Sequence, residues 1–421
     1  MIDTAGQPWI GPTPAPVTVE ELGHADVAVG VLTYNNADTI KSVATAAARG
    51  LAQHFPDATA AIIAADAGSS DGTRELLTAA AGLPTIVLQH EAPAGEQVTV
   101  PFHGVPGRGA ALRATFDAAH RLGARALIVL EADAATASPE WIDRLARPIL
   151  EDKADFVTPL YARRRYDGTI TKLLLSPLVR ALYGRRLHQP LAGQLALSAR
   201  LLEHLLIHPK WNWSGPDSGD VWIAGTAIAD GFTVCETWLG HYAVRSRTRT
   251  TELPAMIAQT LGAVFTLMDR HEDLWLEVRG SEAVRAIGEP SAFSPEPPPP
   301  SVEPMLDAFH LGARDLTAIW ELILAPDTLG EVLGLGLAAP GRFRFSDELW
   351  VRVVYDFALA HHYNVVHREH LLRSLVPLYL GRTAAFVMST RGATAAAADA
   401  ALDAVGGAFE RQKPYLVEHW R

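Results

Sequence analysis

The stretch RALIVLEAD, residues 125–133, is an apolar run that predicts a buried β-strand and ends in two carboxylates one residue apart. Three further apolar runs precede it, at residues 27–34, 60–65 and 85–89. Segments with helical spacing separate these runs, at about residues 37–54, 73–81 and 109–122. Strands that alternate with helices predict a mostly parallel sheet covered by helices on both faces, so the expected fold class is α/β.

Polar side chains follow three of the expected strands, after Tyr34, Ala65 and Leu130. Ligands of parallel sheets bind beyond the carboxyl ends of the strands, and all three polar clusters lie at that edge. Glu131 and Asp133 supply the oxygen ligands that hard divalent cations such as Mg²⁺ or Mn²⁺ prefer. The alternative is that both carboxylates are solvated and cap the following helix.

Two glycine-containing turns add to this edge. Residues 66–73, DAGSSDGT, place a carboxylate and a permissive turn after a strand, where a base or ribose could bind. Residues 106–109, PGRG, allow close approach of the backbone and bring the cation of Arg108 to a helix start, which suits a phosphate. Each turn is also compatible with an ordinary loop, so their order along the chain is the stronger signal.

The composition predicts a folded chain of two or three domains, with 421 residues, 48% of them hydrophobic and 20% charged. Acidic residues outnumber basic residues by 47 to 36, and the net charge of −11 would repel a phosphate backbone or an anionic bilayer. We therefore expect no nucleic-acid partner.

Targeting signals are not evident in the sequence. The single Cys235 can form no internal disulfide, which suits the cytoplasm. The proline-rich start, residues 1–16, lacks the basic and apolar regions of a signal peptide. The longest apolar candidate, residues 191–207, is interrupted by polar side chains such as Gln194 and Arg200. We expect a cytoplasmic protein without a membrane span.

The proline-rich stretch 291–304 divides the chain. We expect a lead-in over residues 1–24 and an α/β domain over 25–290, with a nucleotide-binding half at about 25–135 and an acceptor half at about 136–250. Beyond the linker, residues 305–421 predict an additional helical C-terminal domain, with helices at 306–324, 347–363, 369–380 and 393–413. A homodimer is the commonest oligomer and is expected on that ground alone.

The ordered motifs resemble a known family. The motifs are residues 34–40 (YNNADTI), 66–73, 106–109, 131–133 (EAD) and 189–193 (QPLAG). In this order they are similar to the nucleotide-sugar glycosyltransferases of the GT-A (Rossmann-like) fold, and within them to the retaining glucosyl-3-phosphoglycerate synthase and mannosylglycerate synthase group. The resemblance covers about residues 27–249.

The resemblance implies a role for each matching position. The nucleotide contacts would be Thr33, Tyr34, Asn36, Asp66, Gly68, Arg108 and Ala132. The metal ligands would be Asp133, Glu131 and His241. The sugar or acceptor contacts would be Gln189, Leu191, Ala192, Gly193 and Trp213, and Arg163, in a run of three arginines, could grip an anionic acceptor. Asp133, Asp220 and Gln194 would be the catalytic positions, although Gln194 stands where the relatives have an acid.

These assignments predict transfer of a hexose from a UDP- or GDP-linked sugar to a small anionic acceptor such as 3-phosphoglycerate or glycerate, with Mg²⁺ or Mn²⁺ as cofactor. Three alternatives remain open. An inverting enzyme would need Asp220 or Asp217 as a base. A non-catalytic nucleotide-sugar-binding or scaffold protein would explain Gln194. Each late residue also has a structural reading, with Trp213 at a core edge, Asp220 as a helix cap and His241 as a structural histidine.

Overall fold

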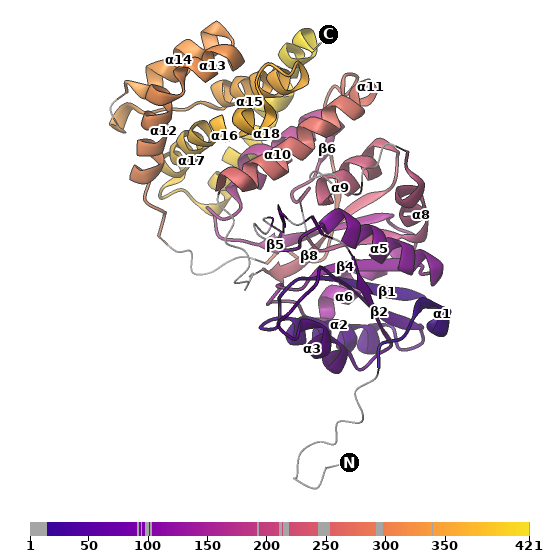
Figure 1. The fold of residues 1–421 in the computed structure, drawn as a ribbon. Coiled ribbons are helices and arrows are strands. Elements are labelled where there is room, and N and C mark those ends of the chain that lie inside the picture. The colour runs from indigo at the N-terminus through magenta and orange to yellow at the C-terminus, as the bar shows by residue number, and fades with distance from the viewer. Residues whose placement is uncertain are drawn as a thin grey trace.

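The protein is built on an eight-stranded sheet with the strand order β10-β8-β5-β7-β4-β1-β2-β3. The computed structural model describes residues 15–90, 92–93, 95–96, 101, 103–191, 193–209, 213, 219–242, 253–291, 298–338 and 340–420. Strand β7 runs antiparallel to both of its neighbours, whereas every other pair in the sheet is parallel. The expected α/β class with a mostly parallel sheet is confirmed (Figure 1).

The strands of the large sheet are β1 (Val27–Thr33), β2 (Ala60–Asp66), β3 (Thr85–Gln89), β4 (Ala126–Glu131), β5 (Phe156–Ala162), β7 (Leu195–Ser198), β8 (Val234–His241) and β10 (Arg285–Ile287). A separate two-stranded sheet pairs β6 (Arg185–Arg186) with β9 (Glu282–Ala283). The first four predicted strands coincide with β1 to β4 to within a residue or two, because each is a short apolar run bounded by turn residues.

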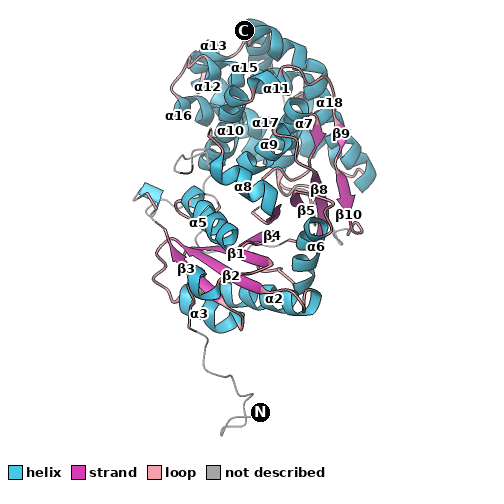
Figure 2. Ribbon diagram, turned by 90° about the vertical axis from the view of Figure 1, so that its right-hand side faces the viewer, coloured by secondary structure: helices cyan, strands magenta, loops and turns pink. Residues whose placement is uncertain are grey.

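Helices cover both faces of the sheet (Figure 2). Successive side chains of β1 point to opposite faces of the sheet, as the two-residue period of a strand requires. Val29 accordingly belongs to the apolar cluster on one face, and Leu32 to the cluster on the other. Helices α2 (Ile40–His54), α3 (Thr73–Ala81) and α6 (Pro139–Leu150) lie on one face. Helices α5 (Arg108–Arg121), α8 (Ala199–Ile207) and α9 (Asp220–Ala229) lie on the other.

The remaining helices are α1 (Val19–Leu22), η1 (Thr171–Leu175), α7 (Ser176–Tyr183), α10 (Leu253–Arg270), α11 (Glu272–Trp275), α12 (Glu303–Asp315), α13 (Thr317–Ile323), α14 (Pro326–Gly336), η2 (Pro340–Arg342), α15 (Asp347–His362), α16 (Arg368–Ser374), α17 (Val376–Thr390) and α18 (Ala395–His419). The predicted helices 306–324 and 369–380 are each two helices. Pro377 lies in the first turn of α17, where a missing N–H is harmless, and so favours a new helix start there.

The C-terminal helices continue the core of one sheet face. A single cluster of buried apolar residues extends from the α5 face of the sheet through α7 and α10 to α15, α17 and α18. The Trp350 Nε1–H donates to the Leu173 carbonyl at 2.8 Å, and Arg180 of α7 contacts Asp403 and Glu410 of α18 at 2.6 and 2.8 Å. The helical part is thus tied to the α/β part by apolar packing and by charge.

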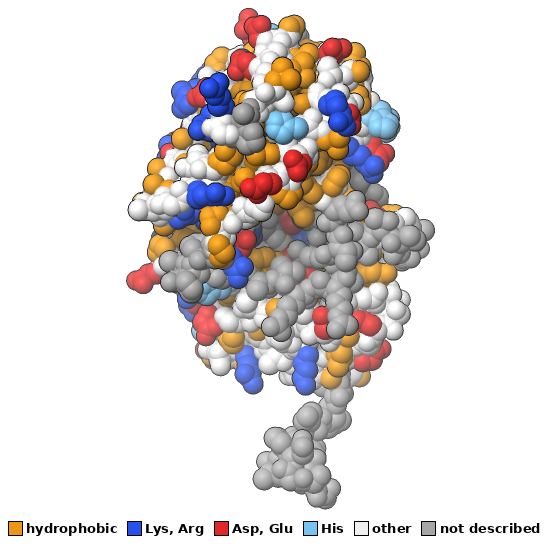
Figure 3. All heavy atoms as spheres, turned by 90° about the vertical axis from the view of Figure 1, so that its left-hand side faces the viewer, with side chains coloured by type: hydrophobic (Ala, Val, Ile, Leu, Met, Phe, Trp, Pro, Cys, Tyr) orange, Lys and Arg blue, Asp and Glu red, His pale blue; other side chains and the backbone are white. Residues whose placement is uncertain are grey.

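The face at the left of Figure 1 carries acidic and basic side chains interspersed with hydrophobic ones (Figure 3). On the coloured part of that face no continuous basic stripe is visible. A nucleic-acid backbone is usually held by such a stripe.

One stretch of the described residues, Arg368–Thr390, is long and apolar enough to cross a membrane by length and composition. It comprises α16 and α17, and 72% of its most apolar window is buried inside the protein. Burial on this scale is what a core helix pair requires. The absence of a membrane span stays a prediction.

Candidate active site

The register of the sheet places the predicted site residues along one edge. Thr33 lies opposite Asp66 on β2, and Leu32 lies opposite Glu131 on β4. Because β7 is antiparallel, Gln194 directly before it reaches the same edge, as does His241 at the end of β8. Residues from five strands therefore meet where parallel sheets bind ligands.

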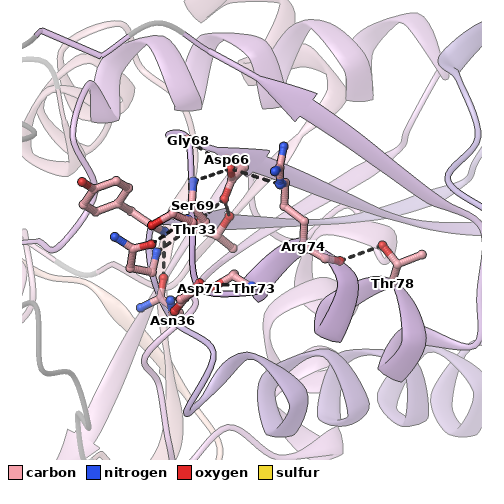
Figure 4. A network of polar contacts seen from close by, with 12 residues as sticks. Thr33, Asn36, Asp66, Gly68, Ser69, Asp71, Thr73, Arg74 and Thr78 are labelled. Atoms are coloured by element: carbon pink, nitrogen blue, oxygen red, sulfur yellow. Dashed lines mark hydrogen bonds and ion pairs between the residues drawn. The ribbon is translucent and has the colours of Figure 1, made fainter.

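Asp66 organises the turn that follows β2 (Figure 4). Its side chain is fully buried, and one carboxylate oxygen accepts hydrogen bonds from the Thr33 and Ser69 hydroxyls at 2.8 and 2.5 Å. The other oxygen accepts from the N–H groups of Gly68 and Ser69 at 3.0 and 2.8 Å. Arg74 approaches this oxygen to 3.8 Å. A ligand that contacted Asp66 directly would have to replace one of these bonds.

The turns after β1 and β2 are bonded to each other. The Asn36 N–H donates to the Thr73 hydroxyl at 2.8 Å, and the Ala37 N–H donates to Asp71 at 3.0 Å. Partial burial by itself would raise the pKa of Asp71, but hydrogen bonds from Thr73 and Ala37 lower it overall. The side-chain oxygen of Asn36 accepts from the Tyr34 N–H at 2.8 Å. Asn36 and Asp66 thus fix the shape of this edge.

A hollow of about 500 Å³ opens beside these turns. Its lining residues are Ala67, Gly68, Ser69, Arg74, Gln89, His90 and Ala92. The lining combines backbone, amide and guanidinium groups, and the volume lies in the range of small-ligand sites. Gly68 is exposed here with φ +90°, a conformation that favours glycine.

The acid pair lies buried at the end of β4. Glu131 is 6% exposed and Asp133 is 3% exposed. One oxygen of Glu131 accepts hydrogen bonds from the Tyr242 hydroxyl at 2.8 Å and the Gln194 amide at 3.3 Å. A Cβ at Gly193 would lie 1.9 Å from the Glu131 carboxyl, so a larger residue there would force Glu131 or the segment to move. The Gly193–Gln194 segment therefore packs directly on Glu131.

Two tyrosines and an arginine form a stack beside Gln194. The rings of Tyr161 and Tyr242 are stacked with centroids 4.5 Å apart, and the Arg163 guanidinium lies 5.3 and 5.5 Å from these centroids. The Tyr161 hydroxyl donates to the Gln194 side-chain oxygen. Burial raises the pKa of Tyr161 well above its usual range, so this hydroxyl keeps its proton.

Arg108 and Asp220 form a buried ion pair. The guanidinium of Arg108, at the start of α5, donates to both carboxylate oxygens of Asp220 at 2.8 and 3.0 Å. Both side chains are at most 8% exposed. The pair joins the expected nucleotide-binding half to α9. The sequence resemblance had assigned Arg108 to nucleotide binding and Asp220 to catalysis, without pairing them.

The other predicted residues lie around this edge. Gln189 is buried and its backbone carbonyl accepts from Thr158, while no partner for its side-chain oxygen lies among the described residues. Leu191 and Ala132 pack in the two apolar clusters, and His241 is exposed. Trp213 packs edge-on against Phe116 at 5.7 Å, as a residue of the core edge would. Ala192 and Asp217 lie outside the described residues.

The donor set at the acid pair fits a hard divalent cation. Glu131 and Asp133 offer carboxylate oxygens, which Mg²⁺ and Mn²⁺ prefer, and both are held in place by burial. Glu131 accepts two hydrogen bonds on one of its carboxylate oxygens.

Residues 28–197 match the sequence model of the family described as "Glycosyl transferase family 2". The matched segment runs from within β1 to within β7 and therefore includes the turns, the acid pair and Gln194. The match covers less than half of the chain, and it shows that this segment is similar to family 2 glycosyltransferases. The expected resemblance to glycosyltransferases is thus confirmed.

Several solved structures are similar to this chain over about three fifths of its length. Glucosyl-3-phosphoglycerate synthase from Mycobacterium tuberculosis with phosphoglyceric acid is 25% identical, with a TM-score of 0.44 over 62% of this chain and 85% of that chain. The same synthase with Mn²⁺, UDP and glucosyl-3-phosphoglycerate is 24% identical, with a TM-score of 0.43 over 63% and 87%. Mannosyl-3-phosphoglycerate synthase from Rubrobacter xylanophilus is 20% identical, with a TM-score of 0.41 over 61% and 77%. No curated protein matches the chain.

Three residues of this site were not identified from the sequence. Tyr161 and Tyr242 lie at the ends of β5 and β8, and Arg74 lies in the first turn of α3. Tyr242 directly follows the predicted His241, and that position was the available signal. Each tyrosine bonds to a residue more than 30 positions away in the sequence, so local sequence spacing could not identify either tyrosine as part of the site.

Proposed function

We propose that this glycosyltransferase domain transfers a hexose from a nucleoside diphosphate sugar to a small anionic acceptor, with retention of configuration and with Mg²⁺ or Mn²⁺. The observation that carries the proposal is the buried acid pair, Glu131 and Asp133, at the carboxyl edge of the sheet. Their carboxylate oxygens are ligands that Mg²⁺ and Mn²⁺ prefer, and a divalent ion held there would place positive charge beside a bound diphosphate.

The donor nucleotide would occupy the edge between the hollow and the acid pair. Gly68 leaves the backbone open beside the hollow, and Arg74 supplies a cation to it. The diphosphate would then extend toward Asp133. A UDP- or GDP-linked hexose is the donor class that we propose.

Electrostatic stabilisation of the leaving diphosphate would be the main catalytic contribution. The metal, when bound, neutralises negative charge that develops on the leaving group. Asp133 would hold that cation, and Tyr242 and Gln194 would orient Glu131 beside it. The N-terminus of α5 would add a partial positive charge that favours an anion, while the Arg108 side chain at that terminus is paired with Asp220.

Retention is supported by the state of Asp220. An inverting reaction needs a carboxylate that accepts a proton from the acceptor hydroxyl. Both oxygens of Asp220 instead accept hydrogen bonds from the Arg108 guanidinium, so this carboxylate is engaged in a buried ion pair. In a retaining reaction a phosphate oxygen can take the proton, so no protein base is required.

An anionic acceptor is supported by Arg163. Its guanidinium lies against two tyrosine rings next to Gln194, which restricts its orientation. A planar cation held in this way suits a carboxylate or a phosphate. The acceptor that we propose is therefore of the phosphoglycerate or glycerate class.

The test is release of nucleoside diphosphate by the purified protein with Mn²⁺, a panel of UDP- and GDP-linked hexoses, and 3-phosphoglycerate or glycerate. We expect turnover with one donor, and a loss of roughly 10³-fold in the Asp133→Asn variant. Asp143→Asn, at a part-buried aspartate of α6 that pairs with Arg147, is the matched control and should keep its activity. Proton NMR of the product would identify the anomer.

Two results would contradict the proposal. Unchanged turnover in Asp133→Asn would exclude the metal site. Tight binding of a nucleotide sugar without any turnover, over the whole panel, would favour the alternative of a binding protein.

A further inference from the structure

Two histidines and an aspartate converge away from the proposed active site. His204 and His208 lie four residues apart at the end of α8, and Asp230 directly follows α9. One ligand atom from each of the three side chains lies within 4.8 Å of the other two. The His204 Nε2 is 2.6 Å and the His208 Nε2 is 3.5 Å from the same oxygen of Asp230.

The ends of two helices meet at this cluster. His208 is the C-cap residue of α8, and Asp230 is the C-cap residue of α9. A helix C-terminus carries a partial negative charge, so it attracts cations and repels a carboxylate. Asp230 thus sits where its own helix disfavours its charge, and two helix ends together favour a cation beside it. Figures 1 and 2 both show α8 and α9 side by side.

The arginine beside this cluster, Arg200, would repel a bound cation only weakly. Phe232 packs against the His204 ring with centroids 5.1 Å apart, and the Arg200 guanidinium lies 4.8 Å from the Phe232 centroid. Arg200 is paired with Asp155 at 2.5 Å, so its positive charge is largely balanced.

The geometry points to a site for a transition-metal dication of the Zn²⁺ class, and we propose that the His204, His208 and Asp230 side chains bind it. Zn²⁺ takes imidazole and carboxylate ligands at about 2.0–2.2 Å, and tetrahedral ligand atoms then lie about 3.3–3.6 Å apart. The 3.5 Å between the His208 Nε2 and the Asp230 oxygen already lies in this range. The 2.6 Å between the His204 Nε2 and the same oxygen would have to increase by about 1 Å. Imidazole ligands select Zn²⁺ over Mg²⁺.

This site is distinct from the acid pair. Asp220, which pairs with Arg108 in the proposed active site, lies at the other end of α9 from Asp230, about 15 Å away along the helix. The three side chains are 34%, 11% and 32% exposed, so a fourth position stays open to water. A bound ion would fasten the end of α8 to the end of α9.

Calorimetric titration of the metal-free full-length protein with ZnCl₂, in the presence and absence of excess Mg²⁺, tests this proposal. We expect one equivalent of Zn²⁺ to bind, Mg²⁺ not to compete, and Asp133→Asn to retain that equivalent. His208→Ala should weaken the binding by more than about tenfold. Co²⁺ in place of Zn²⁺ should give the visible absorption of a tetrahedral site.

The matched control is His24→Ala. His24 is an exposed histidine 3.3 Å from Asp26, and it should bind no ion because it lacks a second imidazole. Zn²⁺ should raise the Tm of the wild type and of His24→Ala but not of His208→Ala. Asp230→Asn keeps the side-chain shape and serves if His208→Ala does not fold. Equal Zn²⁺ affinity in the wild type, His208→Ala and Asp230→Asn would overturn the proposal, as would the absence of binding in the wild type.

Discussion

Helix α9 carries an aspartate at each end, and the two are held by different kinds of partner. Asp220, in the first turn, is buried and bound by the permanently charged Arg108. Asp230, after the last turn, is part-exposed and lies beside two histidines. The helix stabilises the charge at its N-terminus and disfavours it at its C-terminus. The same residue type thus forms a fixed structural pair at one end and a candidate exchangeable cation site at the other.

The largest difference between the two ends is expected on removal of the cationic partner. Arg108→Ala removes the guanidinium that donates to both oxygens of the buried Asp220 carboxylate, so we expect the free energy of unfolding to fall by about 3–5 kcal/mol. Urea unfolding measures it. Arg147→Ala, which breaks the exposed pair with Asp143, should cost less than about 1 kcal/mol. The double variant Arg108→Ala/Asp220→Ala should be more stable than Arg108→Ala; if it is not, the pair is not what stabilises this end.

A Cβ at position 193 tests how closely the active-site edge is packed. Gly193→Ala places an atom 1.9 Å from the Glu131 carboxyl, so Glu131 or the segment must move. A displacement of about 1 Å at a catalytic centre can lower turnover roughly 10²-fold, and we expect a loss of that order in diphosphate release. Gly334→Ala, in α14 with open space around its Cα, is the control and should be neutral. Normal turnover in Gly193→Ala would show that the position of Glu131 is not critical.

Asp155, at the edge of the sheet opposite the acid pair, predicts a pH-dependent effect. Burial by itself would raise the pKa of Asp155, but hydrogen bonds from Arg200, the Thr233 N–H and Ser198 lower it overall. A lowered folded-state pKa contributes stability that is present above the unfolded value of about 3.9 and is lost as the pH falls through the folded value. Asp155→Asn should therefore lower the free energy of unfolding by about 1–2 kcal/mol at pH 7, and by less below pH 4. Urea unfolding at both pH values measures this; an equal cost at both would exclude the charge as its origin.

The smallest effect on stability is expected at the C-terminal end of α9. Without added metal, Asp230→Asn should change the free energy of unfolding by less than about 1 kcal/mol, because its partners are part-exposed. Thermal unfolding in a chelating buffer measures it. A loss as large as that in Arg108→Ala would mean that the two ends of α9 do not differ in the way we describe.

Much of the fold could be predicted because it is encoded locally. The apolar runs at β1 to β4 and the polar turns after them follow from short-range patterns, and so does the arrival of Asp66 and Glu131 at one edge. The division of 369–380 at Pro377 is also local, yet helical spacing alone did not show it.

The rest depends on partners far apart in the sequence. Arg108 and Asp220 are 112 residues apart, and Tyr242 reaches Glu131 across 111. The core that joins α7 and α10 to the C-terminal helices is likewise formed by residues from distant segments. No spacing rule covers such pairs, because their contact depends on how several elements pack.

By itself, the sequence determined an α/β sheet, an acidic strand end and the motif order of a glycosyltransferase, since each rests on residues near one another in the chain. Only the tertiary structure decided that Arg108 binds Asp220, that Gly193 packs on Glu131, and that His204, His208 and Asp230 converge. The physical reason is that charge pairing and close packing act through space, between side chains that the folded backbone brings together.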